Sequence, residues 1–195
     1  MEHPAQRVSA LMERYASGDD AVFDQLYDLT ASRLYGFCLR LTGDPPAADD
    51  LFQETYLRVH RARSTYLPGS DVLHWAFAIA RSAYRDRLRY WRRRPEHLGS
   101  LDDAAQQAAQ QPDEGNTPDA ELTADHLAQV VTVELQKMSE TNRSAYVLLR
   151  EEGVSLKEAA AILGASPDAV KQRAHRAYQQ LRAALRRAQG TEGSP

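Results

Sequence analysis

The chain has 195 residues, of which 43% are apolar, and a formal net charge of −3 at pH 7. This length allows one domain or two small ones, and the composition is ordinary for a globular chain. Cys38 is the only cysteine of the sequence, so a disulfide framework and a cysteine-based metal cluster are excluded. It stands in an apolar run, which predicts that its side chain is buried. No N-terminal signal-peptide core and no run approaching the roughly 20 apolar residues of a membrane span is present, so we expect no membrane insertion and a cytoplasmic protein.

The first part of the chain is predicted to form a series of helices. A short helix ends near Gly18, and the two aspartates that follow can cap a second helix that runs to about residue 42. Its predicted inward side chains are Phe23, Leu26, Leu29, Leu34, Phe37 and Leu41. After Gly43, the sequence Asp-Pro-Pro opens a third helix that continues to about residue 63. Its predicted core side chains are Ala48, Leu51, Phe52, Thr55 and Val59.

The third helix carries polar and acidic residues at its exposed start. These residues are Asp49, Asp50, Gln53 and Glu54. The helix dipole favours acidic residues near a helix N-terminus, so the pattern by itself also fits a solvated face. The residues alone therefore leave a docking surface and a solvated surface both open.

A loop at residues 64–71, marked by Pro68 and Gly69, leads into a helix predicted over residues 73–94. Tyr66 on this loop is a candidate for gripping a nucleic-acid base, although most loop tyrosines pack against the protein. The first half of the helix is apolar on several sides, which predicts burial. Its second half carries a run of arginines opposed only by Asp86: Arg81, Arg85, Arg87, Arg89, Arg92, Arg93 and Arg94.

This run predicts an exposed cationic ridge with aromatic residues, Tyr84, Tyr90 and Trp91, placed between the arginines. Guanidinium groups pair with phosphates and aromatic rings accept unstacked bases, so the pattern is typical of nucleic-acid binding. The alternative is a solvated helix end whose basic residues are favoured by the helix dipole.

An acidic linker is predicted over residues 96–123. No lysine or arginine occurs between Arg94 and Lys137, whereas aspartate, glutamate, glutamine, alanine and proline accumulate. A flexible coil of about thirty residues averages on the order of 30 Å end to end and spans on the order of 100 Å when fully extended. We therefore expect two lobes that can sit far apart on one ligand.

The last lobe is predicted over residues 124–188, followed by a disordered tail at 189–195. Ser155 and Glu158 form a capping box that opens a short helix, Gly164 closes it, and Ser166 with Pro167 opens a long helix. A short helix, a tight turn and a long helix are the helix-turn-helix pattern, and an ordinary antiparallel helix pair is the alternative. The residues predicted to face DNA at the start of the long helix are Lys171, Gln172, Arg173, His175 and Arg176.

Three segments, residues 49–63, 73–94 and 151–185, together resemble the extracytoplasmic-function class of bacterial sigma factors, whose members retain the second and fourth conserved sigma regions. The first reads DDLFQETYLRVHRAR, the second LHWAFAIARSAYRDRLRYWRRR, and the third contains GVSLKEAAAILGASPDAVKQRAHRA. The resemblance implies an all-α fold of two small helical domains, region 2 at residues 1–95 and region 4 at 124–188, joined by a flexible acidic linker.

The resemblance also implies roles for these residues. Asp49, Asp50, Gln53 and Glu54 fall where the family docks on the coiled coil of the largest subunit of RNA polymerase, and a second contact with the polymerase flap is expected. Tyr66, Arg81, Ser82, Arg85, Asp86 and Arg89 fall where the family melts and reads the −10 element. Lys171, Gln172, Arg173, His175 and Arg176 fall where it reads the −35 element. Promoter DNA, core polymerase and an anti-sigma factor are the expected partners, no cofactor is expected, and the linker is expected to occupy a basic channel of the polymerase.

Some positions depart from the family pattern. Ser82 stands where the family has asparagine, so selection of bases at the −10 element is expected to differ. Asp168 and Ala169 replace Gly-Thr before the recognition helix, which places a carboxylate near DNA phosphates.

Two other functions compete with this interpretation. The last lobe alone also resembles the DNA-binding domain of response-regulator-type activators, although that leaves residues 49–94 unexplained. An enzyme acting on nucleic acid is disfavoured because the six histidines are scattered and the sequence shows no phosphate loop or nucleophile with a base.

Overall fold

The computed structural model describes residues 4–93 and 124–190, and every regular element in these two segments is a helix. The first segment holds α1 (Pro4–Ala16), η1 (Asp20–Val22), α2 (Phe23–Thr42), α3 (Pro45–Ala62), η2 (Arg63–Thr65) and α4 (Val72–Arg92). The second holds α6 (Ala124–Lys137), α7 (Glu140–Tyr146), η4 (Val147–Glu151), α8 (Leu156–Leu163) and α9 (Pro167–Ala188). The predicted all-helical fold class is confirmed. The predicted linker at 96–123, Arg94 of the predicted ridge, and residues 191–195 of the tail lie outside the described residues.

Local capping chemistry determines where the helices begin and end. Asp44 accepts a hydrogen bond from a backbone amide in the first turn of α3. Ser155 and Glu158 form the predicted capping box at the start of α8. Gly43 ends α2 and Gly164 ends α8, with φ of 76° and 58°. These left-handed conformations suit glycine because it has no Cβ to clash with the backbone.

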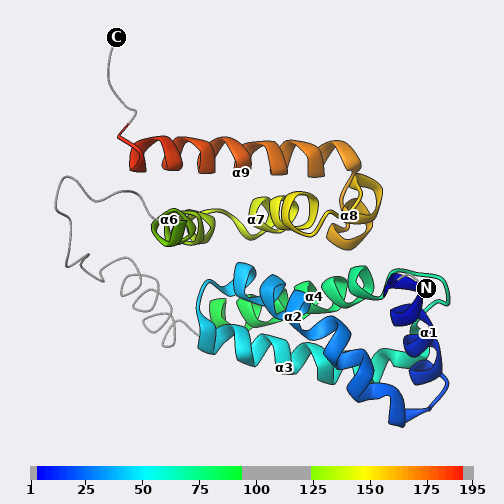
Figure 1. The fold of residues 1–195 in the computed structure, drawn as a ribbon. Helices are drawn as coiled ribbons and strands as arrows, with labels where there is room; N and C mark the ends of the chain where they lie inside the picture. The colour runs from blue at the N-terminus through cyan, green and yellow to red at the C-terminus, as the bar shows by residue number, and fades with distance from the viewer. Residues whose placement is uncertain (1–3, 94–123, 191–195) are drawn as a thin grey trace.

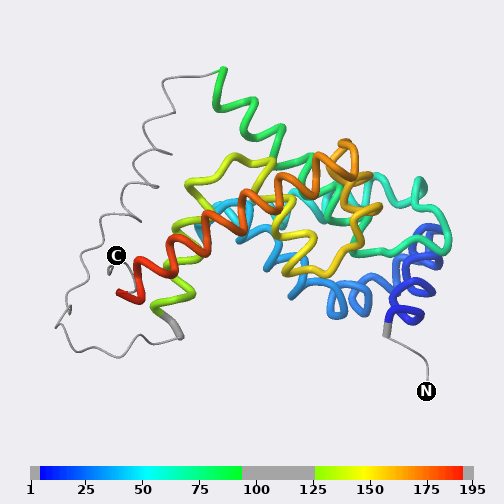
Figure 2. The backbone as a smooth tube through the Cα atoms, turned by 90° about the horizontal axis from the view of Figure 1, so that it is seen from above, coloured from blue at the N-terminus to red at the C-terminus, as the bar shows by residue number. Residues whose placement is uncertain are grey.

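The two segments form two lobes that pack on each other. Helices α1–α4 make the first lobe, and α6–α9 make the second (Figure 1). Helices α6, α7 and α8 lie between α9 and the first lobe, and α9 crosses above the first lobe when the molecule is seen from above (Figure 2). In the helix-turn-helix pair, α9 therefore lies on the outer side of the second lobe, whereas α8 faces the first lobe.

A single hydrophobic cluster runs through both lobes. It joins Phe37 and Phe77 of the first lobe with Ala145 and Leu148 of the second, all of them fully buried. That the lobes can sit far apart on one ligand stays a prediction for the bound chain; in this structure they pack together. The reason is that α2 and α4 present apolar side chains toward the second lobe, and closure removes these side chains from water.

Most of the predicted core positions are buried, with one clear error on α2. The buried stripe of α2 runs through Leu26, Thr30 and Leu34, and Leu29 lies at the edge of that stripe with 41% of its surface exposed. The prediction that Leu29 faces inward was therefore wrong. Cys38 is fully buried, as predicted, and burial raises the pKa of its thiol to about 12.

Candidate functional site

The acidic residues predicted on α3 share one solvent-facing surface, which we call the α3 acidic surface (Asp49, Asp50, Gln53 and Glu54). Asp49, Asp50 and Gln53 are exposed, and Glu54 is half-buried. Glu54 accepts a hydrogen bond from Arg58 Nε at 2.7 Å. Asp50 accepts a longer one from Arg87 Nη2 at 3.4 Å. Ion pairing on this surface therefore comes from basic residues of α3 and α4 beside it.

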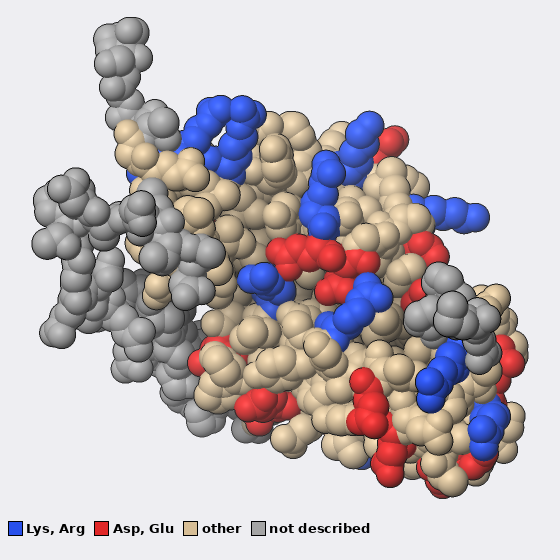
Figure 3. Space-filling model, viewed as in Figure 1, with Lys and Arg blue, Asp and Glu red and all other residues tan. Residues whose placement is uncertain are grey.

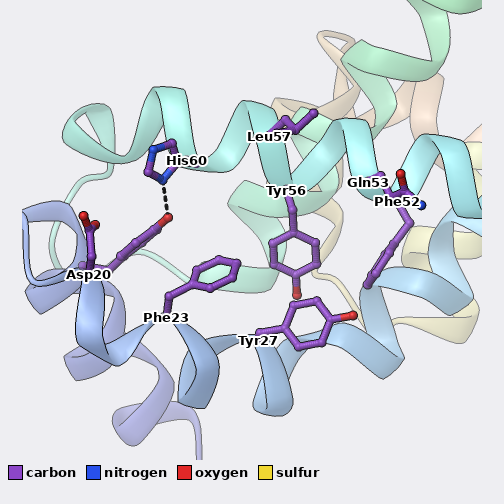
Figure 4. Close-up of a pocket in the computed structure, with 9 residues that line it drawn as sticks. Asp20, Phe23, Tyr27, Phe52, Gln53, Tyr56, Leu57 and His60 are labelled. Atoms are coloured by element: carbon purple, nitrogen blue, oxygen red, sulfur yellow. Dashed lines mark hydrogen bonds between the residues drawn. The ribbon is translucent and has the colours of Figure 1, made fainter.

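A pocket of about 560 Å³ adjoins this surface between α2 and α3. Its lining, which we call the aromatic pocket, consists of Tyr15, Asp20, Phe23, Tyr27, Phe52, Gln53, Tyr56, Leu57 and His60. The side chains of Phe23, Tyr27 and Tyr56 point into the space between the two helices (Figure 4). Gln53 belongs both to the pocket and to the α3 acidic surface, so the two features form one continuous site.

The aromatic pocket is held open by its own ring contacts. The rings of Tyr27 and Tyr56 are 5.0 Å apart between centroids, and those of Phe52 and Tyr56 are also 5.0 Å apart. Tyr56 is anchored further by Thr30, whose hydroxyl lies 2.8 Å from the Tyr56 hydroxyl. Leu57 stands beside these rings with 52% of its surface exposed.

Sequence reasoning missed this pocket. Phe23 and Phe52 were assigned to the core, but both are only half-buried. The signal that was available is the i, i+4 spacing of aromatic residues on two consecutive helices, Phe23 with Tyr27 and Phe52 with Tyr56. A stripe of rings on each of two neighbouring helices indicates a shared aromatic face.

The predicted cationic ridge is partly exposed on α4, and we call its exposed members the α4 arginine ridge (Arg85, Arg89, Arg92 and Arg93). Ser82 is exposed on the same helix, and Asp86 is half-buried. Arg87 points toward α3, where its Nη1 donates to the Ala47 carbonyl at 3.2 Å. The helix therefore offers cationic groups to solvent along its last two turns.

Arg58 links the α3 acidic surface to the α4 arginine ridge. Its Nη1 donates to Asp86 at 2.6 Å while its Nε holds Glu54, and Arg89 also donates to Asp86. Two hydrogen bonds hold the pKa of the Asp86 carboxyl below its usual value. The bond from Arg58 has the larger effect and the bond from Arg89 the smaller. Hydrogen bonds to Glu54 and Asp86 raise the pKa of Arg58, and the effect of Glu54 is the larger.

Arg81 does not belong to the exposed ridge in this structure, contrary to the sequence-based expectation. It is only 6% exposed, and its Nε donates to Glu140 of the second lobe at 2.9 Å. Burial lowers the pKa of its guanidinium, and the Glu140 carboxylate opposes that shift. The sequence could not show this because Glu140 lies 59 positions further along the chain.

Tyr66 is also buried, with 4% of its surface exposed. Its hydroxyl donates to the Ser70 carbonyl across the loop, and its ring packs edge-on against Trp75 at 5.5 Å. In this structure the ring supports the loop from inside and is not available to a base. The next residue of the loop, Leu67, is 71% exposed.

The start of α9 has the expected orientation. Lys171, Gln172, His175 and Arg176 are exposed, and Arg173 is half-buried. Val170 and Ala174 face the core. Basic side chains project from the upper edge of the molecule, where α9 lies (Figure 3). Among the described residues, no helix is long and apolar enough to cross a membrane, and no three His, Cys, Asp or Glu side chains are grouped to hold a metal.

Comparison with known families explains this arrangement. A family model described as Sigma-70 region 2 matches residues 26–94, and one described as Sigma-70, region 4 matches residues 129–181. These two matches, in this order, define a sigma factor built on regions 2 and 4. The chain is 37% identical over 174 residues to RNA polymerase sigma factor CarQ of Myxococcus xanthus, covering 89% of this chain and 95% of CarQ. It is 33% identical over 186 residues to the ECF sigma factor SigF of Caulobacter vibrioides, covering 94% and 97% of the two chains.

The chain belongs to the extracytoplasmic-function (ECF) family of RNA polymerase sigma factors. It is therefore a non-enzymatic factor of transcription initiation that binds DNA through region 4. Neither an activator with only the last lobe nor a nucleic-acid enzyme accounts for the region 2 match. This identification confirms the resemblance that the three sequence segments indicated.

Solved structures agree on the fold. The structure of CnrH in complex with the cytosolic domain of CnrY has a TM-score of 0.63 and 25% identity, covering 91% of this chain and 96% of CnrH. The sigma factor RpoE from Bartonella quintana, solved with the anti-sigma factor NepR, also has a TM-score of 0.63, at 24% identity and with 84% and 96% coverage.

Proposed function

We propose that the chain brings core RNA polymerase to its promoters in the cytoplasm through three separate surfaces. The α3 acidic surface with the aromatic pocket binds the polymerase, the α4 arginine ridge acts at the −10 element, and the start of α9 reads the −35 element. One observation chiefly supports this division: each surface occupies its own helix and keeps exposed polar or charged residues, such as Asp49, Arg85 and Lys171. The assignment to polymerase and promoter elements follows the family.

The polymerase-binding surface fits a helical partner, in keeping with the coiled coil of the largest subunit. An apolar pocket of aromatic rings accepts side chains that such a helix presents at i and i+4 spacing. Basic residues of the partner then meet Asp49 and Asp50 at the edge. The pocket supplies most of the affinity, and the charged edge supplies orientation and association rate. A second contact, between the second lobe and the polymerase flap, rests on the family resemblance.

The −10 element is melted and read by the exposed face of α4. Arg85 and Arg89 pair with phosphates, while unpaired bases of the melted strand are held by stacking and hydrogen bonds. Ser82 offers a shorter hydroxyl group where the family has an amide, which changes the base it can select. Arg81 and Tyr66 join this site only after the contacts that bury them are released.

The −35 element is read as duplex by the start of α9. Lys171, Gln172, His175 and Arg176 project from the side of α9 opposite its core stripe, which places them toward a major groove. Gln172 can make paired hydrogen bonds to adenine and Arg176 to guanine, whereas Lys171 suits a phosphate. Arg173, half-buried, supports this surface from the side.

We also propose that a partner protein, expected to be an anti-sigma factor, holds the chain inactive. The relative CnrH, at 25% identity, was solved in complex with the cytosolic domain of CnrY. Affinity purification from unstressed cells should recover one such partner at near-equal stoichiometry. Recovery of none under any growth condition would contradict this part of the proposal.

The function is tested by reconstitution with core polymerase alone. Promoters are first taken from transcript start sites that appear on overexpression, and run-off transcription is then measured on them. Asp49→Asn/Asp50→Asn should weaken binding to core, and Lys171→Ala/Arg176→Ala should remove the requirement for the −35 sequence while core binding persists.

Strand opening gives the third measurement. Arg85→Ala/Arg89→Ala should leave duplex recruitment intact and reduce permanganate reactivity of the −10 thymines. Failure of the wild-type chain to associate with core, or loss of the same step in all three variants, would overturn the proposed division of roles.

A further inference from the structure

The second lobe contacts the start of the arginine run through two residues of α7 and two residues of α4. The two residues have the same spacing along each helix. Arg81 and Tyr84 are three residues apart on α4, and Glu140 and Arg143 are three residues apart on α7. Arg81 Nε donates to Glu140 Oε1 at 2.9 Å, and Arg143 Nη2 donates to the Tyr84 hydroxyl at 2.8 Å. The Arg143 guanidinium also lies 5.7 Å from the centre of the Tyr84 ring. One turn of α7 therefore covers one turn of α4.

The Arg81–Glu140 pair is shielded from solvent. The two side chains keep only 7% and 13% of their surface exposed. Arg81 Nη1 lies 3.4 Å from the Ile162 carbonyl of α8, so both α7 and α8 enclose the guanidinium. A guanidinium buried in this way needs its carboxylate, because a buried charge without a partner is costly. No phosphate or base can reach Arg81 while α7 and α8 cover it.

Further polar contacts surround this centre: His74 Nδ1 of α4 lies 3.2 Å from Glu158 Oε1 of α8, and other contacts join α2 to the second lobe. Arg33 pairs with Glu152 at 3.0 Å, and Arg40 pairs with Glu151 at 2.8 Å. Gln136 Nε2 donates to the Arg40 carbonyl at 3.2 Å. Basic groups of α2 thus meet acidic groups at the end of η4, beside the apolar cluster that joins the lobes.

We propose that the contact of α7 and α8 with α4 is an autoinhibitory latch, in which Glu140 holds Arg81 and Arg143 holds Tyr84 so that Arg81 and Tyr84 cannot engage DNA until the lobes separate. The proposal rests on the proposed function, because it takes Arg81 to act at the −10 element. The latch closes within one chain and needs no partner protein. An anti-sigma factor then stabilises a state that the chain already adopts.

The chemistry of the contact makes it reversible. A desolvated ion pair gains Coulomb energy but loses hydration, so its net contribution to closure is small. On opening, water or DNA phosphate replaces Glu140 as the partner of Arg81. If only a fraction of the free chains is open, the apparent dissociation constant for DNA is raised by the inverse of that fraction. Breaking the latch should therefore strengthen binding to nucleic acid by the free chain.

The latch is tested on the full chain by fluorescence energy transfer between the lobes. Dyes are placed at Gln25→Cys on α2 and Gln179→Cys on α9, two exposed positions, while the native Cys38 is buried. Glu140→Gln keeps the shape of the side chain and removes its charge. We expect the open-to-closed ratio to rise about tenfold, because Arg81 loses the partner that compensates its burial. Glu13→Gln, at an exposed glutamate of α1, is the matched control and should leave the ratio unchanged.

A second variant acts from the other side of the contact and avoids the cores of both lobes. Arg33→Gln/Arg40→Gln removes the two outer ion pairs from α2 and should also raise the open fraction, by a few-fold. Binding of a single-stranded random 20-mer should strengthen in parallel with the open fraction in both variants. An unchanged energy-transfer distribution in both, with circular dichroism showing intact helices, overturns the latch.

Reconstituted transcription separates this proposal from the proposed function. With saturating core polymerase, the Glu140→Gln chain should initiate at the wild-type level, because the lobes are already apart. Normal initiation with no change in lobe separation would refute the latch and leave the proposed function standing. A wild-type chain that opens as expected but never initiates with core would refute the proposed function instead.

Discussion

At the scale of single residues, the Arg58 side chain connects two surfaces of the first lobe. It bridges Glu54 of the α3 acidic surface and Asp86 beside the α4 arginine ridge. Its position means that charge at the α3 acidic surface and charge at the α4 arginine ridge are not independent. A cationic partner that binds Glu54 leaves Arg58 paired with Asp86 alone. The ion pair between Asp86 and Arg89 is then weakened.

Arg58→Gln should cost a few tenths to about 1 kcal/mol of unfolding free energy at neutral pH, because these side chains are partly exposed and screened by water. The effect should depend on pH. Asp86 has a pKa held below its ordinary value of 3.8 by Arg58, so this stabilisation is complete above about pH 4 and is lost as the pH falls through the lowered value. Urea unfolding between pH 7 and pH 3 should show the gap between wild type and variant closing.

Arg61→Gln is the control for this measurement. Arg61 is exposed on the same helix, so its variant should stay close to wild type at every pH. A gap for Arg58→Gln that stays constant down to pH 3 would show that Asp86 does not carry the effect.

Leu57 and Leu29 form a matched pair for testing the proposed polymerase-binding surface. Both are leucines on the first lobe, 52% and 41% exposed, but only Leu57 lines the aromatic pocket. Leu57→Ala should weaken binding to core polymerase about fivefold, which corresponds to roughly 1 kcal/mol for the part of the side chain that a partner can cover. Fluorescence anisotropy of the labelled chain titrated with core measures this. An equal loss in Leu29→Ala would argue against the pocket as the docking site.

At the scale of elements, the turn between α8 and α9 depends on one backbone conformation. Gly164 has a φ of 58°, and a Cβ built there would meet no atom within 4 Å. Gly164→Ala should therefore destabilise the chain through backbone strain alone, by roughly 1–2 kcal/mol. Gly164→Asn should cost clearly less, because asparagine tolerates the left-handed region. Thermal unfolding of the two variants compares them, and an equal loss in both would mean that contacts of the side chain, not φ, set the cost.

The helices of this fold are largely predictable from sequence because their signals are local. The Asp44 cap, the Ser155 capping box and the glycine stops lie within a turn of the boundaries they set. Burial of Arg81 was not predictable, because it depends on Glu140 in the other lobe. The burial of Tyr66 was also not predictable. The sequence around a loop tyrosine carries no local signal that distinguishes a buried ring from an exposed one.

The site was predictable only in part for the same reason. Exposure of Asp49, Asp50 and Gln53 follows from the 3.6-residue period of α3. The aromatic pocket needs two helices side by side, and periodicity within one helix does not show how a neighbour is aligned. The roles of these residues came from the family resemblance and remain proposals.

At the scale of the whole molecule, the connected core leads to a prediction about cooperativity. Because one hydrophobic cluster runs from α2 and α4 into α7, η4 and α8, neither lobe can unfold without exposing apolar side chains of the other. We expect the full chain to show one calorimetric transition, with equal calorimetric and van't Hoff enthalpies.

The variant Arg33→Gln/Arg40→Gln/Glu140→Gln should split that transition into two. It removes the ion pairs that Arg33, Arg40 and Arg81 make across the lobe contact and leaves the apolar interior of each lobe unchanged. Once closure is weak, each lobe unfolds at the temperature set by its own packing. Two transitions in the wild type would mean that the shared cluster contributes too little to couple the lobes. A single transition in the triple variant would mean that these three ion pairs are not needed for the coupling. The comparison therefore measures how much of closure is electrostatic, and repeating it at high salt should move the wild type toward the variant because the exposed outer pairs are screened.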